Sequence, residues 1–138
     1  MPVEQVREVL LTPAMTRPFR AAPFLPGIVN LRGEVVPVLD LSRLVGIPRS
    51  GSSLPMMLVV MELDEAVAAL GSDEEAGVVS VKPNEITPPP SDLPLEALDC
   101  VVGILAPEED DGTPGLILDG TRLLNLPPIR ELLTTGTV

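Results

Sequence analysis

Two β-prone runs around a short turn constrain this chain more than any other feature. Residues 27–31 and 35–39 are rich in Val, Ile and Leu, and Asn30-Leu31-Arg32-Gly33 lies where they meet. Such runs around a turn that holds Asn and Gly predict a β-hairpin. Arg32 then lies at a tight reversal, where its guanidinium points into solvent. There Arg32 either binds a partner or only keeps the turn hydrated, and the residues alone leave both interpretations open.

Proline and glycine interrupt the chain every few residues, which favours short strands over long helices. The 138 residues include 17 prolines and 11 glycines, and the aromatic residues are Phe19 and Phe24. We therefore predict a mainly β protein with an aliphatic core and short helical turns. Besides the hairpin we expect strands over 3–11, 56–63, 67–70 and 78–81, helical turns over 40–46 and 93–98, an irregular connector over 13–26, a loop over 47–55, a polar break over 71–75 and an extended connector over 83–94.

A later segment repeats the hairpin and the residues that follow it. The matched residue types are Gly27 with Gly103, Asp40 with Asp119, Ser42 with Thr121, and Arg43 with Arg122. The reversal in the second copy is longer and acidic, over residues 108–112. An echo of this kind predicts two related β lobes, which we place approximately at residues 1–55 plus 101–138 and at residues 56–100.

The residues needed for catalysis or metal binding are scarce. The chain has no histidine and one cysteine, so neither an internal disulfide nor a Cys/His zinc site can form. Asp40 and Asp119 follow apolar runs and could be a carboxylate pair in a small hydrolase, but helix capping explains both more simply. Cys100 lies among apolar residues and is expected to be a buried small hydrophobe. We predict no enzymatic activity, cofactor or metal.

Charge is spread unevenly along the sequence. Residues 1–60 hold six arginines against four acids, a net +2, whereas residues 61–138 hold three cations against sixteen acids, a net −13, which together give −11. The acidic half should repel nucleic acid and anionic membranes. The start carries charge where a signal peptide would be apolar, and no apolar stretch is long enough to span a bilayer. These features predict a cytoplasmic protein without direct membrane contact.

The motifs around the hairpin resemble CheW, the coupling protein of bacterial chemosensory arrays. The resemblance covers roughly residues 2–126, and its most specific motif is the Asn-Leu-Arg-Gly turn. The matching segments are Val6-Arg7-Glu8-Val9, Pro23 to Gly27, Ile28 to Gly33, Pro37 to Leu41, Met56 to Leu63, Ile86 to Pro90, and Gly103 followed by Leu118 to Leu124.

The resemblance implies a single CheW-like domain, residues 1–138, with two small β-barrel lobes and no catalysis. It implies an adaptor that joins the cytoplasmic tip of a methyl-accepting chemoreceptor to the regulatory domain of a CheA-type histidine kinase. By position in the motifs, the implied receptor contacts are Val6, Glu8, Gly27, Asn30, Arg32 and Gly33.

Two departures from the family pattern yield further expectations. Family members usually begin earlier, with strands that complete the first barrel, so here we expect an uncovered strand edge that would allow self-association. The strand over residues 67–70 is cut off by Gly71 and should be short or frayed. Both changes would weaken kinase binding, which gives an alternative: a divergent protein that binds the receptor with weak or no kinase binding.

Overall fold

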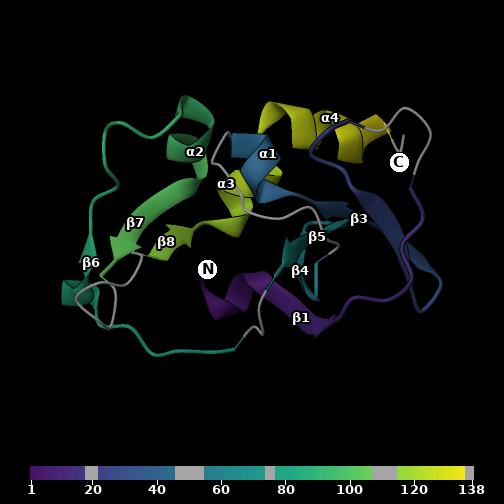
Figure 1. The fold of residues 1–138 in the computed structure, drawn as a ribbon, viewed down its shortest axis with the longest axis horizontal. Helices are drawn as coiled ribbons and strands as arrows, with labels where there is room; N and C mark the ends of the chain where they lie inside the picture. The colour runs from purple at the N-terminus through teal and green to yellow at the C-terminus, as the bar shows by residue number, and fades with distance from the viewer. Residues whose placement is uncertain (18–21, 46–54, 74–76, 107–114, 136–138) are drawn as a thin grey trace.

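The chain forms two β-sheets with short helices between and above them (Figure 1). A computed structural model describes residues 1–17, 22–45, 55–73, 77–106 and 115–135. The strands of the larger sheet are β1 (Val6–Leu11), β2 (Gly27–Leu31), β3 (Glu34–Leu39), β4 (Met57–Leu63) and β5 (Ala66–Ser72), in the order β1-β4-β5-β3-β2. The smaller sheet holds β6 (Ile86–Thr87), β7 (Val101–Leu105) and β8 (Gly115–Leu118), in chain order. The prediction of a mainly β fold is confirmed.

Short helical segments connect and cover the sheets. They are η1 (Val3–Gln5), α1 (Leu41–Val45), η2 (Pro83–Glu85), α2 (Leu95–Cys100), α3 (Gly120–Leu124) and α4 (Pro127–Thr135). The longest, α4, begins with two prolines, which the first turn of a helix tolerates because its N–H groups have no partner there. None of the helices in the described ranges is both long and apolar enough to cross a membrane.

Alternation along the strands divides the core into two aliphatic clusters. Val36 and Val38 of β3 contribute to one cluster with Leu58 and Val60 of β4, and each of these side chains is completely buried. The residues of opposite parity face the other way, where Met61 packs with helical side chains and with the smaller sheet. Both faces of the larger sheet are therefore occupied, which fixes its register.

The sequence repeat is also a structural repeat. The Asp40 N–H donates to the Phe24 carbonyl at 2.7 Å, and the Asp119 N–H donates to the Cys100 carbonyl at 2.9 Å, in each case three residues before the repeated glycine. Each glycine is also crowded by an earlier segment. A Cβ atom at Gly27 would lie 2.6 Å from Met15 Cε, and one at Gly103 would lie 2.5 Å from Ile86 Cγ2. In each sheet, an antiparallel pair of strands, β2 with β3 and β7 with β8, is thus followed by a short helix.

Several local expectations are corrected by the long-range pairing. Residues 78–81 form no strand, and Val78 is 83% exposed, because no described strand pairs with this segment. The strand expected to end at residue 70 continues through Gly71 and Ser72, which pair with Leu58 and Met57. It is therefore neither short nor frayed.

Two further differences concern the sheets and the connectors. Residues 86–87, expected within an extended connector, form strand β6. The approximate lobes also differ from the observed sheets, because β4 and β5 share a sheet with the hairpin, whereas β7 and β8 pair with β6. The expected loop over 47–55 lies outside the described residues except for its last residue. The acidic reversal and residues 74–75 of the polar break also lie outside them.

Candidate partner-binding surface

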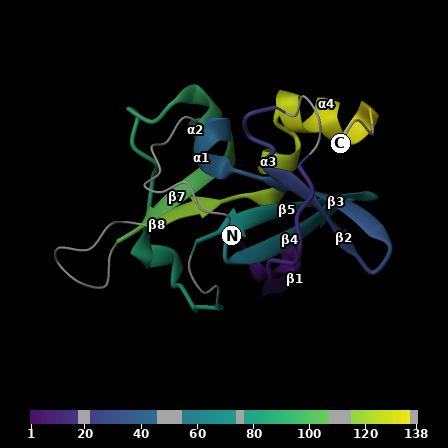
Figure 2. The ribbon, with the colours of Figure 1, turned by 45° about the vertical axis from the view of Figure 1, so that its right-hand side comes forward.

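The predicted hairpin is formed by β2 and β3, and its two-residue turn projects from the body of the protein (Figure 2). Leu31 pairs with Glu34, so Arg32 and Gly33 are the central turn residues. Their φ angles are +52° and +88°, which are the values of a type I′ turn. The Asn30 side-chain oxygen accepts a hydrogen bond from the Gly33 N–H at 2.8 Å and fixes the turn from within. Asn30 and Gly33 therefore set the position of Arg32.

Arg32 is exposed, as predicted, but it is already paired within the chain. Its Nη2 atom lies 2.8 Å from both carboxylate oxygens of Glu8 on β1. The Arg32 side chain is 69% exposed, whereas that of Glu8 is 25% exposed. The hydrogen bond that Arg32 donates to Glu8, and then the negative charge of Glu8, raise the pKa of Arg32. The surface offered to a partner is thus an ion pair rather than an isolated cation.

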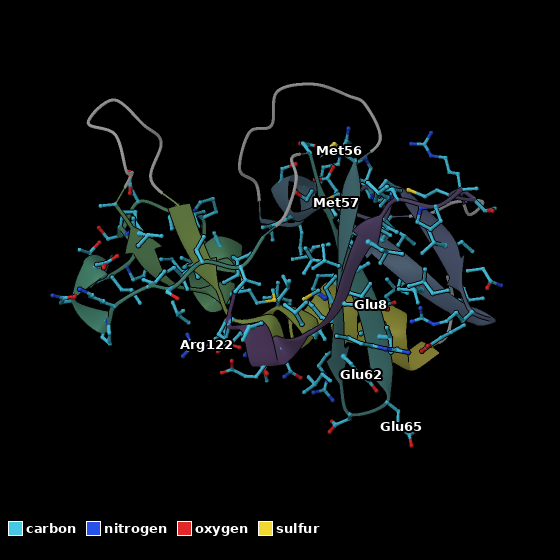
Figure 3. All side chains as sticks on the ribbon, turned by 90° about the horizontal axis from the view of Figure 1, so that it is seen from below. Glu8, Met56, Met57, Glu62, Glu65 and Arg122 are labelled. Atoms are coloured by element: carbon cyan, nitrogen blue, oxygen red, sulfur yellow. The ribbon has the colours of Figure 1, made fainter. Side chains whose placement is uncertain are left out.

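A second ion pair beside the first was missed by the sequence analysis. Arg7 Nη1 lies 3.1 Å from Glu34 Oε2 on the hairpin, and Arg7 Nε lies 3.8 Å from Glu62 Oε2 on β4. Figure 3 shows Glu8 on β1 and Glu62 on β4, which are neighbouring strands of the larger sheet. No sequence pattern indicated this pair, because regular strand alternation sends Arg7 and Glu8 to opposite faces.

Val6 and Gly27 lie within strands of the larger sheet and not in the turn. Val6 is half-buried and pairs with Met61, and Gly27 is buried at the far end of β2 from the turn. The structure therefore brings Glu8, Arg32, Asn30 and Gly33 together and separates Gly27 from them.

The two aspartates proposed as a carboxylate pair both act as helix caps. Asp40 Oδ1 accepts from the Ser42 N–H at 3.1 Å and from the Ser42 hydroxyl at 2.6 Å. Asp119 Oδ1 accepts from the Thr121 and Arg122 N–H groups at 2.9 and 3.2 Å. Within the described ranges, no three carboxylate or thiol side chains gather closely enough to hold a metal ion. The capping interpretation of both aspartates is confirmed.

The cap at Asp119 is completed from the other end of the chain. Gln5 in η1 donates to Asp119 Oδ1 at 3.0 Å and accepts from the Gly120 N–H at 2.6 Å. Desolvation alone would raise the pKa of Asp119, but the hydrogen bonds from Arg122, Gln5 and Thr121, with the charge of Arg122, together lower it. The N-terminal turn is thereby attached to the segment that follows the smaller sheet.

Cys100 is completely buried in the main core cluster, as predicted. Its thiol lies 3.6 Å from the Ala97 carbonyl, and burial, followed by the charge of Asp99, raises the pKa of the thiol. A raised pKa keeps the thiol protonated and unreactive at neutral pH.

Comparison with known proteins agrees with the resemblance seen in the motifs. The model of the CheW-like domain family matches residues 1–127. Chemotaxis protein CheW of Rhizobium meliloti is 30% identical over 86 residues, which are 62% of this chain and 55% of that protein. Protein FrzA of Myxococcus xanthus is 33% identical over 90 residues, which are 65% of this chain and 56% of that protein. The matched stretches thus span about half the length of these relatives.

A solved structure is similar over most of the chain. The crystal structure of the scaffolding protein TtCheW from Thermoanaerobacter tengcongensis superimposes with a TM-score of 0.68 and 27% sequence identity. The match covers 91% of this chain and 83% of that one. The family match, the sequence relatives and this fold agree, and the chain therefore belongs to the CheW-like domain family.

Proposed function

We propose that this chain is a non-enzymatic adaptor of bacterial chemosensory signalling, which couples the cytoplasmic tip of a methyl-accepting chemoreceptor to a CheA-type histidine kinase in the cytoplasm. The family match over residues 1–127 carries this proposal. The capping of both candidate aspartates supports a binding role over a hydrolytic one, because each carboxylate already accepts the N–H groups of a helix start.

The receptor-facing element in this proposal is the ion-paired hairpin tip. Within the described residues, both contacts of the Arg32 guanidinium with Glu8 run through Nη2, and its side chain is 69% exposed, so solvent and a partner can reach it. An arginine held in place on a stiff turn loses little side-chain freedom when it binds. Glu8 beside it adds an acceptor, so the surface complements a helical partner that presents acidic and basic side chains together.

The test is the affinity for a soluble receptor fragment that contains the signalling tip, measured by titration calorimetry. Arg32→Asn removes the cation while keeping a residue that tolerates positive φ. Arg32→Asp places a negative charge next to Glu8 and should weaken binding about tenfold or more. Arg130→Asn is the matched control, because Arg130 lies exposed on α4, where it donates to Asn125 at 2.7 Å.

Each outcome of this titration bears on a different part of the proposal. Binding by the wild type that is unchanged in both Arg32 variants would remove Arg32 from the interface. No binding by the wild type would contradict receptor coupling itself. Titration with the kinase regulatory domain tests the second arm, and tight binding there excludes the alternative of an adaptor with weak kinase binding. That alternative has lost one of its two grounds, because β5 continues to Ser72.

The position of β1 at one end of the larger sheet's strand order bears on self-association. An edge strand can pair with a strand of another chain, so a dimer through β1 stays a prediction of the fold. Light scattering of the protein across a concentration series measures it directly, and a constant monomer mass would contradict it.

A further inference from the structure

We infer that Arg7 is a positioning residue, which holds the hairpin tip against β1 and keeps Arg32 and Glu8 paired at the surface. This inference rests on the proposed function for the role of that surface in binding. Its structural part concerns the attachment of the hairpin to the sheet, and that part can be measured without any partner.

The inference starts from an irregularity in strand β1. Val6 pairs with Met61 and Glu8 pairs with Val60, so two steps along β1 match one step along β4. Arg7 is the extra residue, with no Cα partner of its own in this register. An extra residue of this kind is a β-bulge, which redirects a side chain and is common next to functional sites.

The bulge accounts for the contacts that regular alternation forbids. Arg7 and Glu8 are neighbours, yet both reach the same turn, Arg7 through Glu34 and Glu8 through Arg32. The two pairs have opposite polarity, since β1 contributes Arg7 and Glu8, and the hairpin contributes Glu34 and Arg32. A slip of the hairpin along β1 would therefore bring like charges together, and the arrangement selects one position of the tip.

These pairs join parts of the sheet that the backbone ladder leaves apart. In the strand order β1-β4-β5-β3-β2, the hairpin strands and β1 are separated by β4 and β5. The contacts of Arg7 and Glu8 with Glu34 and Arg32 connect β1 directly to the turn. The second partner of Arg7, Glu62, lies instead on β4, which β1 already meets in the ladder.

This difference between the two partners provides a matched control. Glu34→Gln and Glu62→Gln each remove one negative charge next to Arg7, and their side chains are 41% and 46% exposed. Only Glu34→Gln disconnects the hairpin tip from Arg7. Arg7→Gln disconnects both partners, and the double variant Arg7→Gln with Glu34→Gln tests whether the two residues act as one unit.

The measurement is the solvent exchange rate of the Gly33 amide, observed by NMR, because this N–H is bonded to the Asn30 side chain in the closed turn. We expect Arg7→Gln and Glu34→Gln each to raise the rate about two- to five-fold, the range for an exposed ion pair. The double variant should be no faster than either single variant, and Glu62→Gln should match the wild type.

The affinity for the receptor fragment is then measured on the same variants. It should fall in Arg7→Gln and Glu34→Gln by no more than the factor seen in exchange, since only the closed tip binds. Exchange rates that do not change, or that rise as much in Glu62→Gln as in Glu34→Gln, would overturn the inference. A fall in affinity larger than the factor seen in exchange would also overturn it, because Arg7 or Glu34 would then contact the receptor directly. If the wild type binds no receptor, the proposed function fails while the exchange comparison still decides whether Arg7 holds the tip.

Discussion

Replacing Gln5 by alanine should lower the free energy of unfolding by about 2 kcal/mol. The side chain makes two hydrogen bonds, one to the ionised Asp119 carboxylate at 3.0 Å and one from the Gly120 N–H at 2.6 Å. A bond to a charged group contributes about 1.5–3 kcal/mol and a neutral one about 0.5–1.5 kcal/mol. Gln5 and Asp119 are only half-buried, so water can replace part of the hydrogen bonding in the variant. The lower end of the combined contribution of the two hydrogen bonds therefore applies.

Urea unfolding followed by circular dichroism at pH 7 measures this effect as a change in the midpoint. Gln5→Met is the matched control for packing, because it keeps most of the side-chain volume without the amide. If hydrogen bonding dominates, the methionine variant should be nearly as destabilised as the alanine variant. Gln5→Glu keeps an acceptor for Gly120 but places a second carboxylate against Asp119, so its stability deficit should shrink on acidification.

The refuting result is a loss below about 0.5 kcal/mol in both the alanine and methionine variants, since that is the lower bound for one neutral hydrogen bond. It would mean that the N-terminal turn adds nothing to the cap of α3. A wild-type level of stability in Gln5→Met alone would instead assign the effect to packing.

Three further perturbations test other parts of the fold. Gly33→Ala should lose about 1 kcal/mol in urea unfolding, because its φ is +88° although open space surrounds it, and an unchanged midpoint would contradict the turn assignment. Gly103→Ala should lose about 1–3 kcal/mol in thermal or urea unfolding through the clash with Ile86, and Ile86→Ala in the same chain should recover part of it. Asp119→Asn should be less stable than the wild type at pH 7. Because the folded pKa of Asp119 lies below its unfolded value of about 3.9, the gap should close as pH falls through that folded pKa, and a gap that persists in acid would refute the charged cap.

The parts of the fold that sequence patterns predicted are those encoded within a few residues. The hairpin follows from turn residues next to two apolar runs, and both aspartate caps follow from an acceptor placed just before a helical turn. The repeat was visible because its glycine and aspartate positions serve the same local purposes in both copies. Arg32 was found in the same way, since a turn places it at the surface whatever the rest of the chain does.

What the sequence could not provide is the pairing between distant segments. The parallel contact of β3 with β5 and the bulge at Arg7 depend on register, which no local pattern specifies. The same reason explains why the strand predicted over residues 78–81 was wrong. Val78 is exposed, and no described strand pairs with this apolar run. The partners of Arg32 and Arg7 belong to this class, so the sequence located a cation but missed the ion pairs that hold it.

The contact between Gln5 and Asp119 spans 114 positions of the chain. On the ribosome, the first turn would emerge long before the segment that it caps, and it would wait for nearly the whole domain to be synthesised. Closing so long a loop is slow relative to local steps, so the N-terminal turn should dock among the last events of folding. A nascent chain halted before residue 119 would lack both partners of Gln5 and would leave residues 3–5 accessible to chaperones and proteases.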